Sequence, residues 1–491
     1  MTRPLGDLTG TELSAKLAAG DTSATEILAS TQARIDAVDG QVRAFLTPTP
    51  QLASERADEL DTYLSTGAPQ SPVAGIPVAL KDVLTTNGIR TTCGSKILET
   101  YVPPYDATAW TRLSGAGAVL VGKTNCDEFA MGSSNENSAY GPVYNPWDLE
   151  RVPGGSSGGA AAAVAAGEAV WALGTDTGGS VRQPASLCGV VGLKPTYGRI
   201  SRYGLIAFAS SLDTVGTFTR SVRDAGSMLQ VLAGHDPRDA TSLDIPVPEY
   251  GAHLDEGVAG LRVGVVSEAF GEGVEPAVAA SVRAAIERLA ALGAEVGEAV
   301  LPHATYALSA YYLIAPSECS SNLARYDGVR YGLRVPRPTL LETYCATRAA
   351  GFGREVKRRI MLGTYALRAG YYDQYYRQAQ CVRTLVREDF RQAFARCDLL
   401  ATPTSPVPAF RLGEKLADPL AMYLCDAYTT SANLAGLPGM SLPCGFTAAG
   451  LPVGLQLLGR PLEEETIFRA AFAYEAVEPF SARRPPDPET P

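Results

Sequence analysis

The sequence Val152-Pro-Gly-Gly-Ser-Ser-Gly-Gly159, followed by Gly174-Thr-Asp-Thr-Gly-Gly-Ser-Val-Arg-Gln-Pro-Ala185, carries most of the information in this chain. In each stretch a serine, Ser156 or Ser180, directly follows a pair of glycines. Glycine has no Cβ and tolerates positive φ, so several backbone N–H groups can converge on one point. That arrangement is typical of the oxyanion hole around a serine nucleophile.

The first of these stretches begins a helix and does not join two domains. Residues 160–166 read Ala-Ala-Ala-Ala-Val-Ala-Ala, a composition with high helix propensity. A phosphate-binding loop would continue from its glycines into Gly-Lys-Ser or Gly-Lys-Thr, and no such continuation occurs here. We therefore interpret both glycine pairs as parts of a catalytic site.

The base that would activate such a serine has to come from elsewhere in the chain. Histidine is scarce, because only His235, His253 and His303 are present and none lies near either serine in sequence. The residues of a Ser-His-Asp triad are close in space and not necessarily in sequence. The distance in sequence therefore makes a histidine base less favoured but does not exclude it. The alternative is Lys81, towards the end of an apolar, β-favouring run over 73–83.

A lysine that ends a buried strand can act as a base because burial disfavours its charged form. Lowering a lysine pKa from about 10.4 to about 7 corresponds to roughly 4–5 kcal/mol, which desolvation can supply. The neutral amine can then accept a proton from a serine hydroxyl. Most lysines are exposed, so Lys81 alone would be a weak candidate. Beside two glycine-flanked serines it is the favoured base.

Three separate segments together resemble the amidase signature family: Lys81, the loop Pro153–Gly159 and the segment Asp176–Arg182. Their order, and the spacing between Ser156 and Ser180, agree with the pattern of that family. The resemblance implies that Ser180 is the nucleophile that forms an acyl-enzyme and that Lys81 is the base. It also implies that Ser156, preceded by a cis peptide bond, relays the proton between them.

With these roles, the backbone around the nucleophile would stabilise the transition state. The amides of Thr177, Gly178 and Gly179, together with that of Ser180, are the expected oxyanion donors. Losing one such donor typically costs about 3–4 kcal/mol of transition-state stabilisation.

Other polar residues close to the motifs are interpreted as supports. Asp176 and Arg182 flank the nucleophile and are expected to brace its loop through an ion pair. Cys126 and Cys188 are interpreted as small packing residues, which is the commoner role of a cysteine.

Three further segments narrow the resemblance within the family: 125–137, 353–365 and 433–440. They are similar to the glutaminase subunits of tRNA-dependent amidotransferases. This similarity implies a heterotrimer in which the chain hydrolyses glutamine and supplies ammonia for converting Glu-tRNA(Gln), or Asp-tRNA(Asn), to the amidated form. It also implies that a partner subunit uses ATP and Mg²⁺ and holds most of the mischarged tRNA, and that this chain binds no cofactor or metal. Which tRNA is used, and how far the partners control glutamine hydrolysis, stays open.

Free glutamine places two charges in a pocket. Its α-carboxylate needs a cation and its α-ammonium needs an anion, or neither charge can be buried at low cost. Arginine suits the carboxylate because its planar fork binds two oxygens. The resemblance assigns these roles to Arg359 and Asp426, although Arg358 is an alternative one residue away, and both arginines could instead form a solvated helix face. Tyr311 and Tyr312 are further candidates to line the pocket.

The composition bounds the class of protein. The chain has 491 residues, of which 46% are hydrophobic and 19% charged, as in ordinary soluble globular proteins. Its net charge of −10 makes it a poor nucleic-acid binder by itself. Nine cysteines without a Cys-x-x-Cys pair favour reduced thiols over a zinc site. No secretory signal or membrane-length apolar run occurs, so a cytoplasmic location is expected.

Alternating β-like and helical runs predict a layered α/β fold, and the resemblance implies a large mixed sheet covered by helices on both faces. We predict a helical segment over 1–65 that packs on the core, an amidase signature domain over 66–480, and a disordered tail over 481–491. Thr9 and Ser23 are each followed three residues later by glutamate, which predicts two capping boxes.

Two other functions keep the same motifs. A free-standing amidase that hydrolyses a small carboxamide would share every catalytic residue. A catalytically inactive scaffold would share the fold, but the complete set of Lys81, Ser156 and Ser180 disfavours it.

Overall fold

Strands and helices alternate along the chain in the computed structural model, which describes residues 3–66 and 71–486. The strands are β1 (Phe45–Pro48), β2 (Pro77–Lys81), β3 (Val119–Thr124), β4 (Trp171–Asp176), β5 (Val191–Lys194), β6 (Thr214–Thr219), β7 (Arg262–Val266), β8 (Glu295–Ala299), β9 (Leu399–Pro403), β10 (Gly439–Phe446) and β11 (Pro452–Gly459). The α-helices are α1 (Gly10–Ala19), α2 (Ala24–Val42), α3 (Pro50–Ser65), α4 (Thr108–Gly115), α5 (Gly158–Ala166), α6 (Arg182–Cys188), α7 (Val222–Leu232), α8 (Pro276–Ala291), α9 (Ala307–Asn322), α10 (Leu340–Gly351), α11 (Arg354–Leu367), α12 (Gln378–Phe394), α13 (Pro419–Tyr423), α14 (Thr430–Ala435) and α15 (Glu464–Val477). Of the helices in these two ranges, none combines the length and apolarity that crossing a membrane requires.

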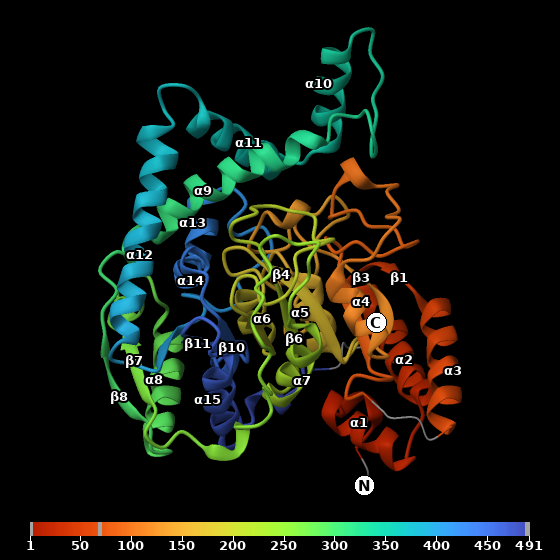
Figure 1. Cartoon of the computed structure of the whole chain (residues 1–491), viewed down its shortest axis with the longest axis vertical. Coiled ribbons are helices and arrows are strands. Elements are labelled where there is room, and N and C mark those ends of the chain that lie inside the picture. Colours follow the sequence, from red (N-terminus) through yellow and green to blue (C-terminus); the bar gives the residue numbers. More distant parts are fainter. Residues whose placement is uncertain (1–2, 67–70, 487–491) are drawn as a thin grey trace.

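One large sheet runs through the molecule (Figure 1). Within the described residues its eleven strands lie in the order β1-β3-β2-β4-β6-β5-β10-β11-β9-β7-β8. β2 is parallel to β3 and β4, and β7 is parallel to β8 and β9. The pairs that join these two groups are antiparallel. The sheet is therefore mixed, as predicted.

Alternate side chains of the strands face different helical layers, because successive residues of a strand point to opposite faces. In β2, Val78 and Leu80 pack in a core that includes α7, α8 and α15, whereas Ala79 packs in a second core with α2, α3 and α5. In β9, Leu399 joins the first core and Leu400 joins a third, which includes α9 and α12. Helices on both faces of the sheet are thus confirmed.

The N-terminal segment 1–65 is not purely helical. Both predicted capping boxes are confirmed: Thr9 exchanges hydrogen bonds with Glu12, and Ser23 with Glu26, at the starts of α1 and α2. Between α2 and α3, however, β1 pairs antiparallel with β3 at the edge of the sheet. Part of this segment therefore belongs to the same sheet as the rest of the chain.

The predicted disorder of the segment 481–491 is corrected for its first six residues. Ser481 Oγ donates to Glu475 Oε1 at 2.7 Å, and the guanidinium of Arg483 lies 4.8 Å from the centre of the Phe446 ring. These contacts hold the segment on the body despite its polar, proline-rich composition. The last five residues lie outside the part of the chain that the structure describes.

Helix α11 packs closely on α9, and Figure 1 shows the two helices side by side. Gly363 makes this approach possible, because a Cβ at that position would lie 1.9 Å from the carbonyl oxygen of Pro316 in α9. Gly40 in α2 offers a contrast, since a Cβ there would meet nothing within 4 Å.

We expect Gly363→Ala to lower the free energy of unfolding by about 1–3 kcal/mol or more, because the methyl group overpacks the α9–α11 contact. Gly40→Ala should raise it by about 0.5–1 kcal/mol, because alanine loses less backbone entropy in a helix. Urea-induced unfolding of the two variants measures both effects. A shift of the same sign in both would contradict the assigned packing.

Candidate active site

The residues predicted to be catalytic meet at one edge of the sheet. β2 and β4 are neighbouring parallel strands, so their carboxyl ends lie together. Lys81 ends β2 and Asp176 ends β4. The loop before α5 carries Ser156, and the turn between β4 and α6 carries Ser180.

Lys81 is fully buried at the centre of three hydroxyl groups. Its Nζ lies 2.7 Å from Ser156 Oγ, 2.9 Å from Ser157 Oγ and 2.9 Å from Thr175 Oγ1. Ser157 Oγ donates its own proton to the backbone carbonyl of Thr175 at 3.1 Å, so it can only accept from Lys81. When the amine is neutral, its lone pair can receive a proton from Ser156, whose hydroxyl is the nearest of the three.

Burial makes Lys81 a base at moderate pH. It lowers the pKa of Lys81 to about 8, against the opposing effects of Cys126, Asp127 and other nearby acidic groups. The interpretation of Lys81 as an exposed strand-end residue is therefore wrong. Two of the histidines have other partners, since His253 pairs with Glu256 and His303 with Asp389.

The two serine loops lie against each other. The peptide bond between Gly155 and Ser156 is cis, as the resemblance implied. The Ser157 amide donates to the carbonyl oxygen of Ser180 at 3.3 Å. Ser156 is fully buried, whereas Ser180 retains 8% of its surface, so Ser180 is the serine that a substrate can reach. The passage of a proton from Ser180 to Ser156 stays a prediction.

A buried ion pair shapes the turn that precedes α6. Arg182 donates to both carboxylate oxygens of Asp176, from Nε at 3.1 Å and from Nη2 at 3.0 Å, which confirms the predicted brace. The same carboxylate accepts the amides of Gly179 at 2.9 Å and Val181 at 3.2 Å. Burial alone would raise the pKa of Asp176, but Arg182 holds it well below its usual range. Asp176 thus stays ionised and pins the turn.

These bonds change the expected set of oxyanion donors. The amide of Gly179 points at Asp176 in this conformation, so it is not directed at a substrate oxygen. The amides of Thr177, Gly178 and Ser180 remain as predicted donors. Gly179 itself has φ of +137°, a conformation that L side chains rarely adopt.

Aromatic and hydroxyl side chains cover this turn. A Cβ at Gly178 would lie 2.5 Å from the ring of Tyr311, so only glycine lets the ring approach so closely. Thr429 Oγ1 donates to the carbonyl oxygen of Gly178 at 2.5 Å and also to that of Asp426 at 3.2 Å. Thr429 therefore links the nucleophile turn to Asp426.

Asp426 forms an anionic pole close to the nucleophile. Ser133 Oγ donates to its carboxylate at 2.6 Å, and the Tyr312 hydroxyl lies 3.5 Å from the same oxygen. Burial raises the pKa of Asp426 to about 7, against the hydrogen bond from Ser133 and the charge of Arg359. A substrate ammonium group would favour the ionised form of this carboxyl. Gln183 connects the pole to the serine loop, because its side-chain nitrogen donates to Ser133 O and its side-chain oxygen accepts from the Gly155 amide, both at 3.0 Å.

Arg359 forms the cationic pole. Its side chain is 3% exposed, and its Nε donates to Glu355 Oε1 at 2.8 Å. Arg358 retains 29% exposure and pairs with the same glutamate from the outer side of α11. The structure therefore favours Arg359 over Arg358 as the pocket residue, and the solvated-face interpretation fails for Arg359. Tyr312 lies beside the same arginine, with its ring centre 5.3 Å from the Arg359 guanidinium.

Three contributors to the site escaped the sequence analysis. Ser133 and Glu355 form hydrogen bonds with the two poles, and the ring centre of Tyr423 lies 5.4 Å from the Arg359 guanidinium. Ser133 lies inside the quoted segment 125–137, and Glu355 stands four residues before Arg359, a spacing that places both on one helix face. No sequence pattern around Tyr423 indicated a role in the site.

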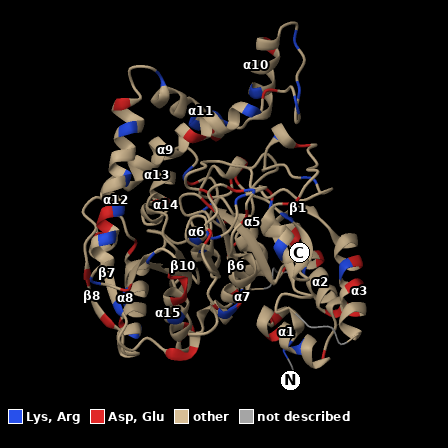
Figure 2. Cartoon of the chain, viewed as in Figure 1, with Lys and Arg blue, Asp and Glu red and all other residues tan. Residues whose placement is uncertain are grey.

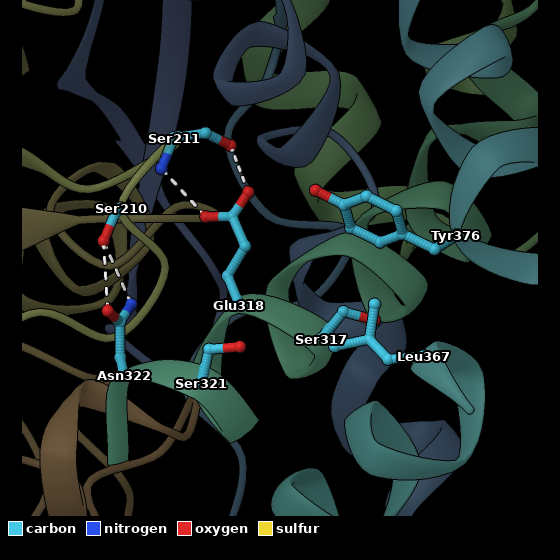
Figure 3. A pocket seen from close by; sticks show the side chains of 8 residues that line it. All are labelled: Ser210, Ser211, Ser317, Glu318, Ser321, Asn322, Leu367 and Tyr376. Carbon is cyan, nitrogen blue, oxygen red and sulfur yellow. Dashed lines mark hydrogen bonds between the residues drawn. The ribbon is translucent and has the colours of Figure 1, made fainter. Parts of the chain in front are cut away.

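The loop around residues 206–213 supports both the turn and the cationic pole. Asp213 accepts the Thr177 hydroxyl at 2.7 Å, and the Phe208 ring lies 5.5 Å from the Arg359 guanidinium. Beside the loop is an open pocket of about 310 Å³, most of whose lining residues have polar side chains (Figure 3). In it the carboxylate of Glu318 accepts both the amide and the hydroxyl of Ser211. The polar side chains of this pocket thus hold the loop in place.

The two cysteines near the motifs are inert. Cys126 and Cys188 are fully buried, and burial raises the pKa of both thiols well above the usual range. Neither can supply a thiolate nucleophile near neutral pH.

Comparison with known proteins decides the family. The family model described as Amidase matches residues 26–468. The chain belongs to the amidase family. The family resemblance seen in the sequence is thereby confirmed. Among its relatives, the A subunit of the glutamyl-tRNA(Gln) amidotransferase of Moorella thermoacetica is 62% identical to this chain over 478 residues. That match covers 97% of this chain and 98% of the relative.

Solved amidase structures share the whole fold. The crystal structure of the A subunit of glutamyl-tRNA(Gln) amidotransferase from Thermotoga maritima has a TM-score of 0.83 and 42% identity, covering 100% of this chain and 99% of its own. A 6-aminohexanoate cyclic dimer hydrolase complexed with substrate has a TM-score of 0.84 and 30% identity, covering 98% and 99%. Because a hydrolase and a component of an amidotransferase share this fold, fold alone does not choose between their activities.

The reactivity of Ser180 should follow the neutral form of Lys81. We expect the rate of Ser180 labelling by an aryl sulfonyl fluoride to rise with an apparent pKa near 8, by about tenfold from pH 7 to pH 9. Mass spectrometry of the labelled peptide measures this rate, and Ser180→Ala is the blank. A rate that is constant or falls over this range would contradict a lysine base.

Proposed function

We propose that this chain is the glutaminase subunit of a tRNA-dependent amidotransferase. It hydrolyses glutamine through an acyl-Ser180 intermediate and supplies ammonia for the ATP-dependent conversion of Glu-tRNA(Gln), or Asp-tRNA(Asn), to the amidated form. The names and high identity of its relatives support this reaction class. The cytoplasm, where tRNA is charged, is the location that the proposal implies.

One observation of the structure supports glutamine as the substrate. A buried arginine and a buried aspartate both lie beside Tyr312: the guanidinium of Arg359 is 5.3 Å from its ring centre, and the carboxylate of Asp426 is 3.5 Å from its hydroxyl. Thr429 joins the backbone of this aspartate to the nucleophile turn. A small neutral amide has no use for either charge. An amino acid with a side-chain amide uses both, with its carboxylate on Arg359 and its ammonium on Asp426.

In the first half of the proposed reaction, Ser180 becomes acylated. The neutral amine of Lys81 takes the proton of Ser156, which takes that of Ser180. Ser180 Oγ attacks the side-chain amide carbon of glutamine, and the remaining turn amides stabilise the oxyanion. The C–N bond then breaks, and the proton on Lys81 returns through Ser156 to the departing nitrogen as ammonia leaves.

In the second half, water releases glutamate. A water molecule attacks the acyl carbon while its proton passes to Lys81 by the same relay. The bond between this carbon and Ser180 Oγ breaks, and the proton returns to Ser180. The chain therefore ends each cycle in its starting protonation state.

The other steps of the complex are assigned to partner subunits. In this proposal the complex is a heterotrimer, and a partner uses ATP and Mg²⁺ to activate the tRNA-bound carboxylate before ammonia attacks it. The net charge of −10 supports a tRNA contact made mainly by a partner. Figure 2 agrees, because basic and acidic residues are interspersed along the helices.

Separating the two half-reactions tests the catalytic roles. We expect Ser180→Ala and Lys81→Ala to lower glutamine-dependent amidation of mischarged tRNA by about 10³-fold or more, since residues of such a relay act as a unit. Amidation with added ammonium chloride should stay within about twofold, because it bypasses Ser180. Equal loss of both activities would show instead that the residues serve folding or assembly.

The free-standing amidase remains the second candidate, because the 6-aminohexanoate cyclic dimer hydrolase shares the fold. Affinity purification of the tagged chain from its native cells, followed by size-exclusion chromatography, distinguishes the two. We expect two other chains to co-elute at equal stoichiometry. A chain that elutes alone and hydrolyses neutral carboxamides faster than glutamine would favour the free-standing enzyme.

A further inference from the structure

Glu355 organises the cationic pole from one turn earlier on α11. Its Oε1 accepts from Arg359 Nε at 2.8 Å and from the hydroxyl of Tyr423 at 2.8 Å. Its other oxygen pairs with Arg358 on the outer side of the helix. One buried carboxylate therefore ties three neighbouring side chains together.

Aromatic rings fix the plane of the Arg359 guanidinium. Its central carbon lies 5.5 Å from the ring centre of Phe208, 5.3 Å from that of Tyr312 and 5.4 Å from that of Tyr423. Tyr312 and Tyr423 stack at 3.9 Å with their planes 22° apart. Tyr423 is thus both part of this cage and a donor to Glu355, so it couples the carboxylate to the rings.

The hydrogen bond to Glu355 leaves the two terminal nitrogens of the Arg359 guanidinium available for a substrate. A guanidinium can grip a carboxylate through two parallel N–H bonds. Glu355 engages Nε, and among the described residues no hydrogen bond from either terminal nitrogen of Arg359 is found. Burial alone would raise the pKa of Glu355, but Arg359 and the Tyr423 hydroxyl hold it below its ordinary value. The ionised glutamate therefore pairs with Arg359, and also with Arg358, before any substrate arrives, and this cluster keeps a net positive charge for a substrate carboxylate.

The position of α11 does not depend on this glutamate. At its start, the amide of Gly353 donates to Glu128 Oε2 at 2.7 Å. Near its end, Gly363 lies against the backbone of Pro316. Removing the charge of Glu355 should therefore disturb the orientation of Arg359 more than the fold.

We propose that Glu355, acting with Tyr423, is a positioning residue that determines specificity: it orients the two terminal nitrogens of Arg359 towards the α-carboxylate of the substrate. This inference rests on the proposed function, in which that carboxylate is glutamine's. Glu355 makes the pocket selective for amides that carry an α-carboxylate, and it takes no part in the chemistry at Ser180.

The test compares a charged and a neutral amide on the full-length chain, purified with its partner subunits. Ammonia release is measured with glutamine and with butyramide, which has an amide but no α-carboxylate. The variants are Glu355→Gln, Tyr423→Phe and Arg359→Ala. Glu388→Gln is the matched control, because it removes the charge from an exposed Glu–Arg pair on α12.

We expect Glu355→Gln to raise the KM for glutamine about tenfold or more with kcat changed less than about threefold, since a charge-assisted contact is lost in binding. Tyr423→Phe should raise this KM by a smaller factor. For butyramide, which has no α-carboxylate for Arg359 to bind, kcat/KM should fall by a smaller factor than for glutamine in both variants. In the Arg359→Ala background, Glu355→Gln should add nothing further, because its effect passes through Arg359.

Three results would overturn the inference. An unchanged KM for glutamine in Glu355→Gln would remove its positioning role, and equal losses with glutamine and butyramide would show a merely structural one. A tenfold rise in KM in Glu388→Gln would show that any lost charge has this effect. If the unmodified complex released ammonia from butyramide but not from glutamine, the proposed function would fail as well, and this result is distinct from the other three.

Discussion

The burial of Lys81 is the constraint on which the site depends. A fully buried ammonium group is costly, so burial lowers the pKa of Lys81 to about 8, and the protein surrounds the amine with hydroxyl groups. Three hydroxyls can exchange hydrogen bonds with either protonation state of the amine, whereas a carboxylate in their place would pair with the charge and raise the pKa. The choice of serine and threonine around Nζ is therefore part of what makes this lysine a base.

At the end of the neighbouring strand β4, a buried group is kept in its charged form. Asp176 is buried as deeply as Lys81, yet it is kept ionised by Arg182 and by backbone amides of the turn. Two parallel strands thus end side by side, one in a lysine whose pKa is lowered by burial and the other in an aspartate that stays ionised beside Arg182. Because the carboxylate of Asp176 is satisfied by its own turn, its charge fixes the backbone around Ser180 and opposes the loss of the proton from Lys81 only at a distance.

Much of this site could be predicted from the sequence because its chemistry is carried by short motifs. Glycine pairs, the serines that follow them and the strand that delivers Lys81 are local features, as are the two capping boxes. The rest depends on distances across the fold. The choice between Arg358 and Arg359 depends on the rotation of α11 against α9, and the direction of the Gly179 amide depends on a carboxylate three residues away. Tyr423 reaches Glu355 from another helix, and the 481–486 segment packs through contacts with residues that no local pattern relates to it.

The two poles of the pocket explain how one amidase fold can serve a single amino acid. The proton relay acts on any accessible amide, so selectivity has to come from groups that bind the rest of the substrate. In the proposed function these groups are Arg359, which Glu355 holds in place and which keeps its charge for a substrate carboxylate, and Asp426, whose carboxyl has a pKa of about 7 in the absence of substrate. A ligand with only one charge would leave one of these poles without its partner. In the proposed function an α-amino acid satisfies both at once and brings its side-chain amide to Ser180, which retains 8% of its surface.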